Sequence, residues 1–137
     1  MVDTDVKVAV VVRDDLATWQ KLNVTAFLVS GFGSQHPGLV GKPYLDGSDV
    51  EYLPMLAQPV VVLVGDQDRI DRAFRRARAR DLSIGVYTDD LFSTGNDVDN
   101  RAAVRAVPTD DLRLAGFSVA GGRRDVDKAL DKLRLHP

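Results

Sequence analysis

The sequence predicts an α/β fold: one mainly parallel four-stranded sheet with helices on both faces and a small β-arm insertion. Residues 6–12 and 59–64 are apolar runs rich in valine, and neither shows the alternation of a half-exposed strand. Such continuity is typical of strands that helices cover on both faces. Stretches with helical spacing follow both runs, which is typical of strand–helix–strand units with parallel strands.

Four strands and four helices are expected along the chain. The strands lie at residues 6–12, 59–64, 83–88 and 112–120, and the helices at 18–30, 67–80, 96–107 and 124–133. Gly31 ends the first helix, and Asn96 or Asp97 caps the third. Within the irregular segment 36–55, Asp46-Gly47 lies between two mixed runs and predicts the hairpin of the β-arm.

The first helix is apolar on two sides. One stripe recurs at helical spacing and consists of Trp19, Leu22, Ala26 and Val29. Val24 and Leu28 lie on another side. A helix of this kind contacts its own sheet and, in addition, either an insertion or a second subunit. If no insertion covers the second side, the pattern predicts a homodimer.

Composition excludes several classes of function. The 137 residues include no cysteine, which rules out disulfides, thiolate catalysis and cysteine-ligated metal. His36 and His136 lack metal-ligand spacing, and no phosphate-loop, dinucleotide or Gly-x-Ser-x-Gly motif is present, so we expect no metal and no cofactor. A net charge of −2 disfavours a general nucleic-acid coat. With no targeting segment and no membrane-spanning stretch, we expect one soluble cytoplasmic domain, residues 1–137.

A site is expected beyond the carboxyl ends of the strands, where ligands bind in open α/β sheets. The loops at residues 13–21 and 87–94 each follow a predicted strand. If those two strands are parallel, both loops open on one edge, and Lys21 approaches Asp89, Asp90 and Thr94.

Each charged candidate in these loops has two interpretations. Lys21 binds a phosphate or polarises a carbonyl, or else it forms a local salt bridge with Asp14 or Asp15. Asp89 and Asp90 supply a general base or position water, or else they cap the loop.

The aromatic, amide and arginine candidates also have two interpretations each. Trp19 and Phe92 stack on a flat ligand, or they pack in the core or a dimer interface. Asn23 anchors a ligand, or it bonds a loop backbone. An arginine stripe on the second helix tracks a nucleic-acid backbone or is a solvated face, and interleaved aspartates favour the solvated face. Its members are Arg69, Arg72, Arg76 and Arg80.

Motifs along nearly the whole chain resemble a bacterial family known as domain of unknown function 2000. The signature is the helix segment 19–28, Trp-Gln-Lys-Leu-Asn-Val-Thr-Ala-Phe-Leu. Further matches are Tyr52-Leu53-Pro54-Met55, Gln58-Pro59, Tyr87-Thr88-x-x-Leu91-Phe92-x-Thr94 and Leu135-His136-Pro137.

That family is similar in fold to the type II peptidyl-tRNA hydrolases, which cleave the ester joining a peptide to tRNA. Residues 10–16 followed by Lys21 resemble the enzymes' first strand and the start of their lysine-bearing helix. Asp90-x-x-x-Thr94 resembles their Asp-Ala-Gly-x-Thr loop. The resemblance implies a fold of this type, with Lys21, Asp90 and Thr94 in the places of residues important to the enzymes.

Two functional hypotheses follow from the resemblance. In the first, the chain is a non-catalytic module that binds a small molecule at the carboxyl edge of the sheet, through Trp19, Asn23, Asp89 and Phe92. In the second, it hydrolyses a peptidyl-tRNA-like ester: Lys21 holds or polarises a substrate such as the tRNA 3′ end, while Asp90 and Thr94 position water. The enzymes' helix continues with a glutamine and a histidine where this chain has Val-Thr-Ala-Phe, which favours the first hypothesis.

Overall fold

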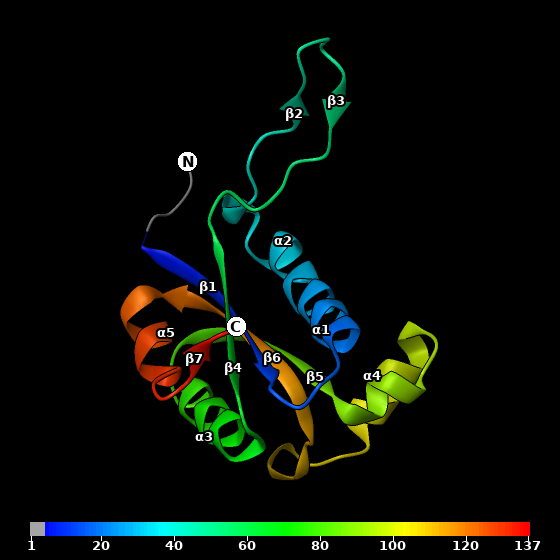
Figure 1. Cartoon of the computed structure of the whole chain (residues 1–137), viewed down its shortest axis with the longest axis vertical. Helices are drawn as coiled ribbons and strands as arrows, with labels where there is room; N and C mark the ends of the chain where they lie inside the picture. The colour runs from blue at the N-terminus through cyan, green and yellow to red at the C-terminus, as the bar shows by residue number, and fades with distance from the viewer. Residues whose placement is uncertain (1–4) are drawn as a thin grey trace.

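A computed structural model, which describes residues 5–137, shows a five-stranded mixed sheet in the order β5-β6-β1-β4-β7 (Figure 1). The strands are β1 (Val6–Arg13), β4 (Val60–Gly65), β5 (Leu82–Thr88), β6 (Leu114–Gly122) and β7 (Arg134–Leu135). Of these strands, β1 and β4 pair in parallel, and every other neighbouring pair is antiparallel. The prediction of a mainly parallel four-stranded sheet is therefore wrong.

The reason for this error lies in the burial of β1. Ala9 and Val11 pack into one hydrophobic cluster, whereas Val10 and Val12 pack into another on the opposite face. Because side chains alternate between the faces of a strand, burial on both faces produces a continuous apolar run in any strand. Such a run indicates that the strand is covered on both faces. It does not indicate whether the neighbouring strand is parallel or antiparallel.

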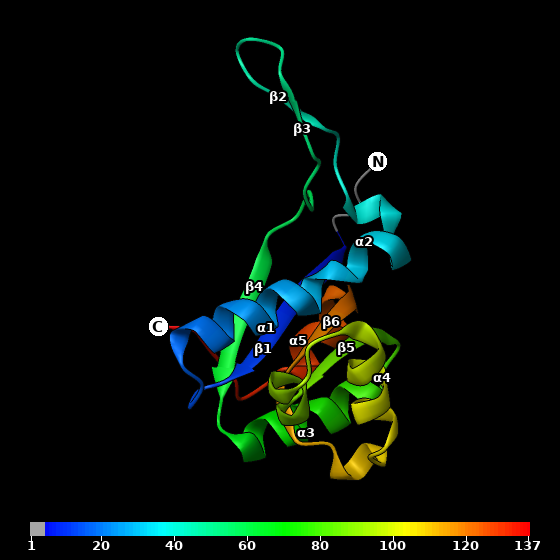
Figure 2. The ribbon, with the colours of Figure 1, turned by 90° about the vertical axis from the view of Figure 1, so that its right-hand side faces the viewer.

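Helices cover both faces of the sheet, as predicted (Figure 2). One face carries α1 (Thr18–Ser30), whose bounds match the prediction, followed by α2 (Phe32–Gln35) and the 3₁₀ turn η1 (Pro37–Leu39). The other face carries α3 (Gln67–Arg78) and α5 (Arg123–Ala129). The third predicted helix, α4 (Asp97–Arg105), lies near the end of β5 and is capped by Asn96, which accepts a hydrogen bond from Asp99 N at 2.9 Å.

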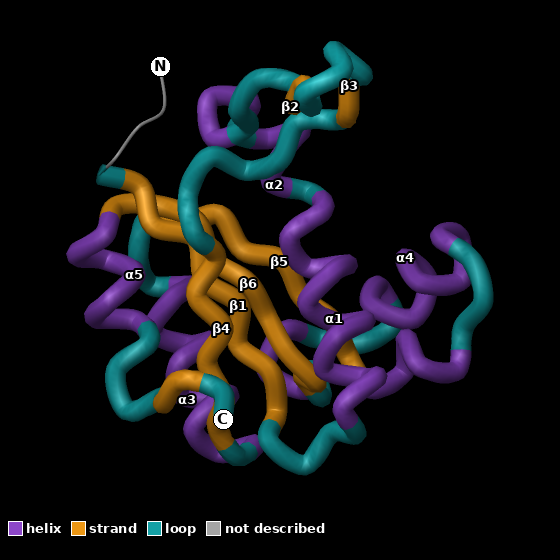
Figure 3. Tube along the Cα trace, turned by 45° about the horizontal axis from the view of Figure 1, so that its top comes forward, coloured by secondary structure: helices purple, strands orange, loops and turns teal. Residues whose placement is uncertain are grey.

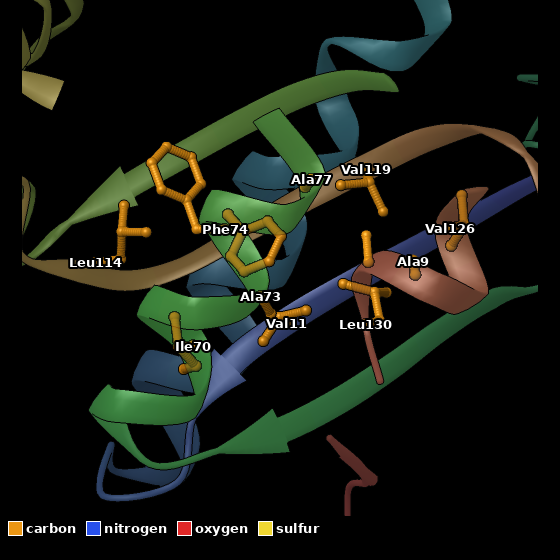
Figure 4. Close-up of a cluster of buried hydrophobic side chains, with 12 residues drawn as sticks. Ala9, Val11, Ile70, Ala73, Phe74, Ala77, Leu114, Val119, Val126 and Leu130 are labelled. Atoms are coloured by element: carbon orange, nitrogen blue, oxygen red, sulfur yellow. The ribbon is translucent and has the colours of Figure 1, made fainter. Parts of the chain in front are cut away.

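The core beneath α3 forms because every third or fourth residue of that helix is apolar. Ile70, Phe74 and Ala77 are buried, as predicted from their helical spacing. Phe74 meets Phe117 of β6 edge-on, with 5.6 Å between ring centroids. Figure 4 shows the cluster to which Phe74 belongs. This cluster packs α3 against β6, which lies between β5 and β1 in the sheet.

On the opposite face α1 lies close to the sheet because two strands carry glycine beneath it. A Cβ at Gly116 would stand 2.5 Å from Val11 O and 3.1 Å from Val24 Cγ1. The buried residues of α1 are Val24 and Leu28, whereas Trp19 of the other predicted stripe is 62% exposed. The core-facing side of α1 is therefore the one that includes Val24, and of the Trp19 stripe only Val29 packs against the core.

The C-terminal segment differs from the predicted helix 124–133. The α5 helix ends at Ala129, and Lys132 adopts a left-handed turn with φ of 74°. Residues 134–135 then pair with β4 as β7, and His136 N donates to Val62 O at 3.2 Å. A two-residue strand has too short an apolar pattern to be found from sequence.

The predicted β-arm is present as a hairpin of β2 (Tyr44–Leu45) and β3 (Glu51–Tyr52), which rises away from the sheet (Figures 1 and 3). Asp46 organises its turn by accepting hydrogen bonds from Ser48 N at 2.8 Å, Val50 N at 3.1 Å and the Tyr52 hydroxyl at 2.8 Å. These bonds, that from Ser48 first, lower the pKa of the Asp46 carboxyl.

The close approach of α1 predicts that Gly116→Ala lowers the free energy of unfolding by roughly 1–3 kcal/mol, the usual range for overpacking. The added methyl has no room, because a backbone oxygen lies beside it. Urea unfolding of the variant measures this change. Gly47→Ala in the arm is the control, since no heavy atom lies within 4 Å of its Cβ position. Equal stability of the two variants would contradict the tight packing of Gly116 between the β1 backbone and the α1 side chains.

Candidate functional site

The carboxyl ends of β1 and β5 lie at the same edge of the sheet. The two strands run in one direction because β6, which lies between them, is antiparallel to both. The 3₁₀ turn η2 (Asp89–Ser93) follows β5 at this edge, and α1 begins there after β1. The two predicted loops therefore open on one edge, although the strands that lead into them are not neighbours.

Arg13, the last residue of β1, joins the chain segments that meet at this edge. Its Nη1 lies 2.9 and 3.0 Å from the two carboxylate oxygens of Asp89, and 3.1 Å from Gln67 Oε1. The same atom lies 3.2 Å from Leu114 O, and Nε donates to Asp15 Oδ1 at 2.6 Å. Burial opposes the charge of Arg13, but hydrogen bonds and charge from Asp15 and Asp89 prevail and raise its pKa.

A cleft of about 340 Å³ opens beside this edge, between α1, η2 and α4. We call it the aromatic cleft; it is lined by Trp19, Asn23, Phe27, Tyr87, Leu91, Phe92, Thr94, Gly95, Asn96, Asp97 and Asn100. Phe92 lies centrally, with ring centroids 6.1 Å from Trp19 and 5.1 Å from Tyr87. Phe27 continues the series, 5.9 Å from Tyr87. The result is a continuous aromatic wall.

Neutral polar groups lie along this wall. Asn23 Nδ2 donates to the Tyr87 hydroxyl at 3.5 Å, and the Thr94 hydroxyl bonds Leu91 O at 3.0 Å and the Asn100 side-chain amide. Burial raises the pKa of Tyr87, although the hydrogen bond from Asn23 works against the shift. The Tyr87 hydroxyl thus stays protonated at neutral pH and can donate a hydrogen bond.

The cleft carries little charge. Among its lining side chains, Asp97 is the one with a full charge at neutral pH, and Arg101 binds that carboxylate at 2.8 Å. A site with this composition suits an uncharged molecule better than a phosphate or carboxylate.

The structure gathers most of the predicted ligand-binding residues in this cleft. Trp19, Asn23 and Phe92 line it, together with Thr94, which was predicted to position water. Asp89 does not, since Arg13 binds its carboxylate. That contact matches the structural interpretation of Asp89 more closely than a ligand-binding role.

The three residues predicted as a catalytic set are not brought together. Thr94 lines the aromatic cleft, Asp90 is an exposed residue outside it, and Lys21 lines a separate cleft beside the C-terminal tail. Helical geometry explains the separation: at about 100° per residue, Lys21 and Asn23 project from α1 about 200° apart. Lys21 and Thr94 therefore line two clefts that share no residue.

Sequence reasoning missed several residues of the site. Phe27 follows Trp19 and Asn23 at four-residue intervals, so the spacing on α1 was a signal that could have identified it. Tyr87 begins the predicted loop 87–94 but was not singled out within it. Asn100 had no comparable signal, because the position of α4 relative to α1 depends on the fold. A cation directly after a buried strand was the available signal for Arg13.

The predicted arginine stripe on α3 largely serves the fold. Arg76 donates to Ala129 O at 3.0 Å and to Asp131 O at 2.7 Å, and Arg80 pairs with Asp125 at 2.9 Å. These contacts tie α3 to α5 and the turn after it. Arg69 pairs with its own helix cap, Asp66, at 3.0 Å. Such pairing favours a structural over a nucleic-acid-binding interpretation.

Comparisons with known proteins extend these observations. A family model described as "Protein of unknown function (DUF2000)" matches residues 6–137. The solved structure of a protein of unknown function from Agrobacterium tumefaciens is similar, with a TM-score of 0.94 and 39% sequence identity. The match covers 98% of this chain and 100% of that one. The comparison with curated proteins finds no match.

Two further findings concern residues 5–137 as a whole. None of their helices is long and apolar enough to cross a membrane. The same residues contain no group of three or more His, Cys, Asp or Glu side chains that could hold a metal ion.

The contacts of Arg13 predict that Arg13→Met destabilises the protein by roughly 2 kcal/mol, a value between those of exposed and buried ion pairs. The substitution leaves Asp89 without its cation at a half-buried position. Chemical denaturation measures the loss. Arg101→Met removes a fully exposed pair and is expected to leave the stability nearly unchanged. Similar losses in the two variants would show that Arg13 is not the main tie at this edge.

Removal of the buried hydroxyls of Thr88 and Ser118 is predicted to change the stability in opposite directions. Both residues are buried, but the Ser118 hydroxyl donates to Leu28 O at 2.9 Å, whereas Thr88 Oγ1 has no hydrogen-bond partner among residues 5–137. An unsatisfied buried hydroxyl costs about 1–3 kcal/mol. We therefore expect Thr88→Val to raise the unfolding free energy by about 1 kcal/mol and Ser118→Ala to lower it, as measured in urea. A loss in both variants would mean that the Thr88 hydroxyl is satisfied in solution.

Proposed function

This chain belongs to the DUF2000 family of proteins of unknown function, and from the geometry of its cleft we propose that it binds a small, flat, uncharged molecule at the carboxyl edge of the sheet. The ligand class is a neutral heteroaromatic ring, such as a nucleobase, with hydrogen-bond donors and acceptors at its edge. The chain acts as a binding module and carries out no chemistry on this ligand.

The observation that carries the proposal is the combination of an aromatic wall with neutral amides in one cleft. Trp19, Phe92 and Tyr87 contact one another in sequence, and Asn23 and Asn100 lie beside them. Aromatic side chains stack on flat rings, at a gain of about 1–3 kcal/mol per base. Amide side chains match the paired donor and acceptor edges of such rings.

The unpaired donors and acceptors of the cleft indicate how polar its ligand should be. Within the described chain, Asn23 Oδ1 and Asn100 Nδ2 have no hydrogen-bond partner, and the Tyr87 hydroxyl accepts from Asn23 while its own proton is not donated. One acceptor and two donors thus line the cleft near the rings. This set fits a heteroaromatic edge, whereas an aliphatic ligand would leave these groups unpaired.

The alternative hypothesis is hydrolysis of a peptidyl-tRNA-like ester by Lys21, Asp90 and Thr94, on a fold like that of the type II peptidyl-tRNA hydrolases. It rests on resemblance in the sequence motifs. The positions of Lys21 and Asp90 outside the aromatic cleft weigh against it, and so does the lack of an unpaired cation among the side chains that line this cleft. A tRNA 3′ end brings phosphates, which such a cleft does not favour.

The proposal is tested by titrating the protein with adenine, uracil, nicotinamide and their saturated analogues, and following Trp19 fluorescence and amide NMR shifts. We expect at least one aromatic ring to bind with a dissociation constant between about 1 µM and 1 mM, the range for ligands of this size. Trp19→Ala should weaken binding by roughly 5- to 100-fold through lost stacking. Tyr87→Phe, which keeps the ring, should weaken it about 3- to 10-fold.

Lys21→Ala is the matched control, because this residue lies on another face of the same helix. The proposal expects unchanged ligand affinity in this variant. The proposal would be contradicted if none of the rings bound, or if the rings and their saturated analogues bound equally well. Cleavage of peptidyl-tRNA by the wild type that Lys21→Ala abolishes would establish the hydrolase instead.

A further inference from the structure

The β-arm, residues 41–56, carries an unusual amount of exposed apolar surface. Among residues 5–137, its large exposed side chains are Tyr44, Leu45, Val50, Tyr52, Leu53 and Met55, and Leu53 is 86% exposed. Two views at right angles show the arm standing clear of the sheet and its helices (Figures 1 and 2). A concentration of exposed apolar side chains on one projecting segment is typical of an interaction site.

The base of the arm is fixed to the body. Gly41 N donates to Met55 O at 2.9 Å, and Ala57 N donates to Leu39 O at 2.8 Å. Leu39 is itself buried, in a cluster with Phe32 and Ala120. The arm is thus a hydrogen-bonded projection with a defined direction. Because an isolated two-stranded hairpin is only marginally stable in water, its outer half gains most from being covered.

The body of the same chain contains a second cleft that suits this arm. The tail cleft, as we call it, has a volume of about 430 Å³ and lies between α1 and the C-terminal tail. It is lined by Val12, Thr18, Lys21, Leu22, Thr25, Ala26, Val62, His136 and Pro137. Leu22 on its wall is 67% exposed, so the cleft leaves a large apolar side chain uncovered.

The charges of the arm and the tail cleft are complementary. The arm carries Asp46, Asp49 and Glu51 against the single cation Lys42, a net charge of −2. Lys21 is the one side chain lining the tail cleft that has a full positive charge, and it forms no ion pair within residues 5–137. The carboxylates of the arm therefore have one unpaired cation, Lys21, to meet on the wall of an apolar cleft.

We propose that two copies of this chain form a symmetric dimer in which the β-arm of each subunit occupies the tail cleft of the other. The arm points away from its own body, so it does not fill the cleft of its own chain (Figure 2). A two-fold axis repeats one arm–cleft contact twice, which covers both apolar surfaces on both copies. The inference does not depend on the ligand of the aromatic cleft.

The test is sedimentation velocity of the full chain over a concentration series. Wild type should sediment as a dimer, and both Leu53→Glu in the arm and Leu22→Glu in the cleft should raise the dimer dissociation constant at least tenfold. Both positions are exposed in the single chain, so neither change should disturb folding, and the milder Leu53→Ser and Leu22→Ser serve if either does. Val98→Glu on α4, also at an exposed apolar residue, is the matched control and should dimerise like wild type.

Mixing the two variants distinguishes a specific arm–cleft contact from nonspecific hydrophobic association. Leu53→Glu retains an intact cleft and Leu22→Glu an intact arm, so a mixture restores one of the two contacts. We expect a mixed dimer, seen by fluorescent labelling of one variant, that is tighter than either variant alone. A monomeric wild type, a dimer insensitive to both substitutions, or loss in Leu53→Glu without loss in Leu22→Glu would overturn the proposal, as would no gain on mixing.

Discussion

The guanidinium of Arg13 is the interaction on which the candidate site depends. It lies at the carboxyl end of β1 and contacts the turn after β1, the start of α3, the first residue of η2 and the first residue of β6. The segments that place Trp19 and Phe92 are therefore tied to one half-buried cation. A planar group with five N–H donors suits this task better than a lysine ammonium would, because several acceptors lie in different directions around it.

Three faces of the α1 helix contact three different parts of the structure. Val24 and Leu28 face the sheet, Trp19 and Asn23 face the aromatic cleft, and Leu22 faces the tail cleft. A helix that is apolar on more sides than its own sheet can cover must contact other partners along the remaining faces. In this protein one uncovered face supports the ligand proposal and another supports the dimer proposal, and the two faces do not share a residue.

The site was partly accessible from the sequence. The carboxyl ends of the strands were the expected location, and the pairing of Trp19 with Phe92 at that edge agrees with it. Lys21 lies in the tail cleft instead, because its expected place followed from the topology of the two loops and from the family resemblance, without regard to its position around the helix. A side chain two residues from Asn23 projects to nearly the opposite side, so it cannot share the aromatic cleft while the helix is regular.

Local chemistry in the sequence determined α1 from Thr18 to Ser30, the core face of α3, the cap at Asn96 and the hairpin around Asp46, because each depends on residues a few positions apart. The order and direction of the strands were decided by tertiary structure. β6 enters between β5 and β1 because its two faces must be buried against α1 and α3 together, and no short-range pattern encodes that requirement. The aromatic cleft likewise exists only once β5, η2 and α4 pack beside α1.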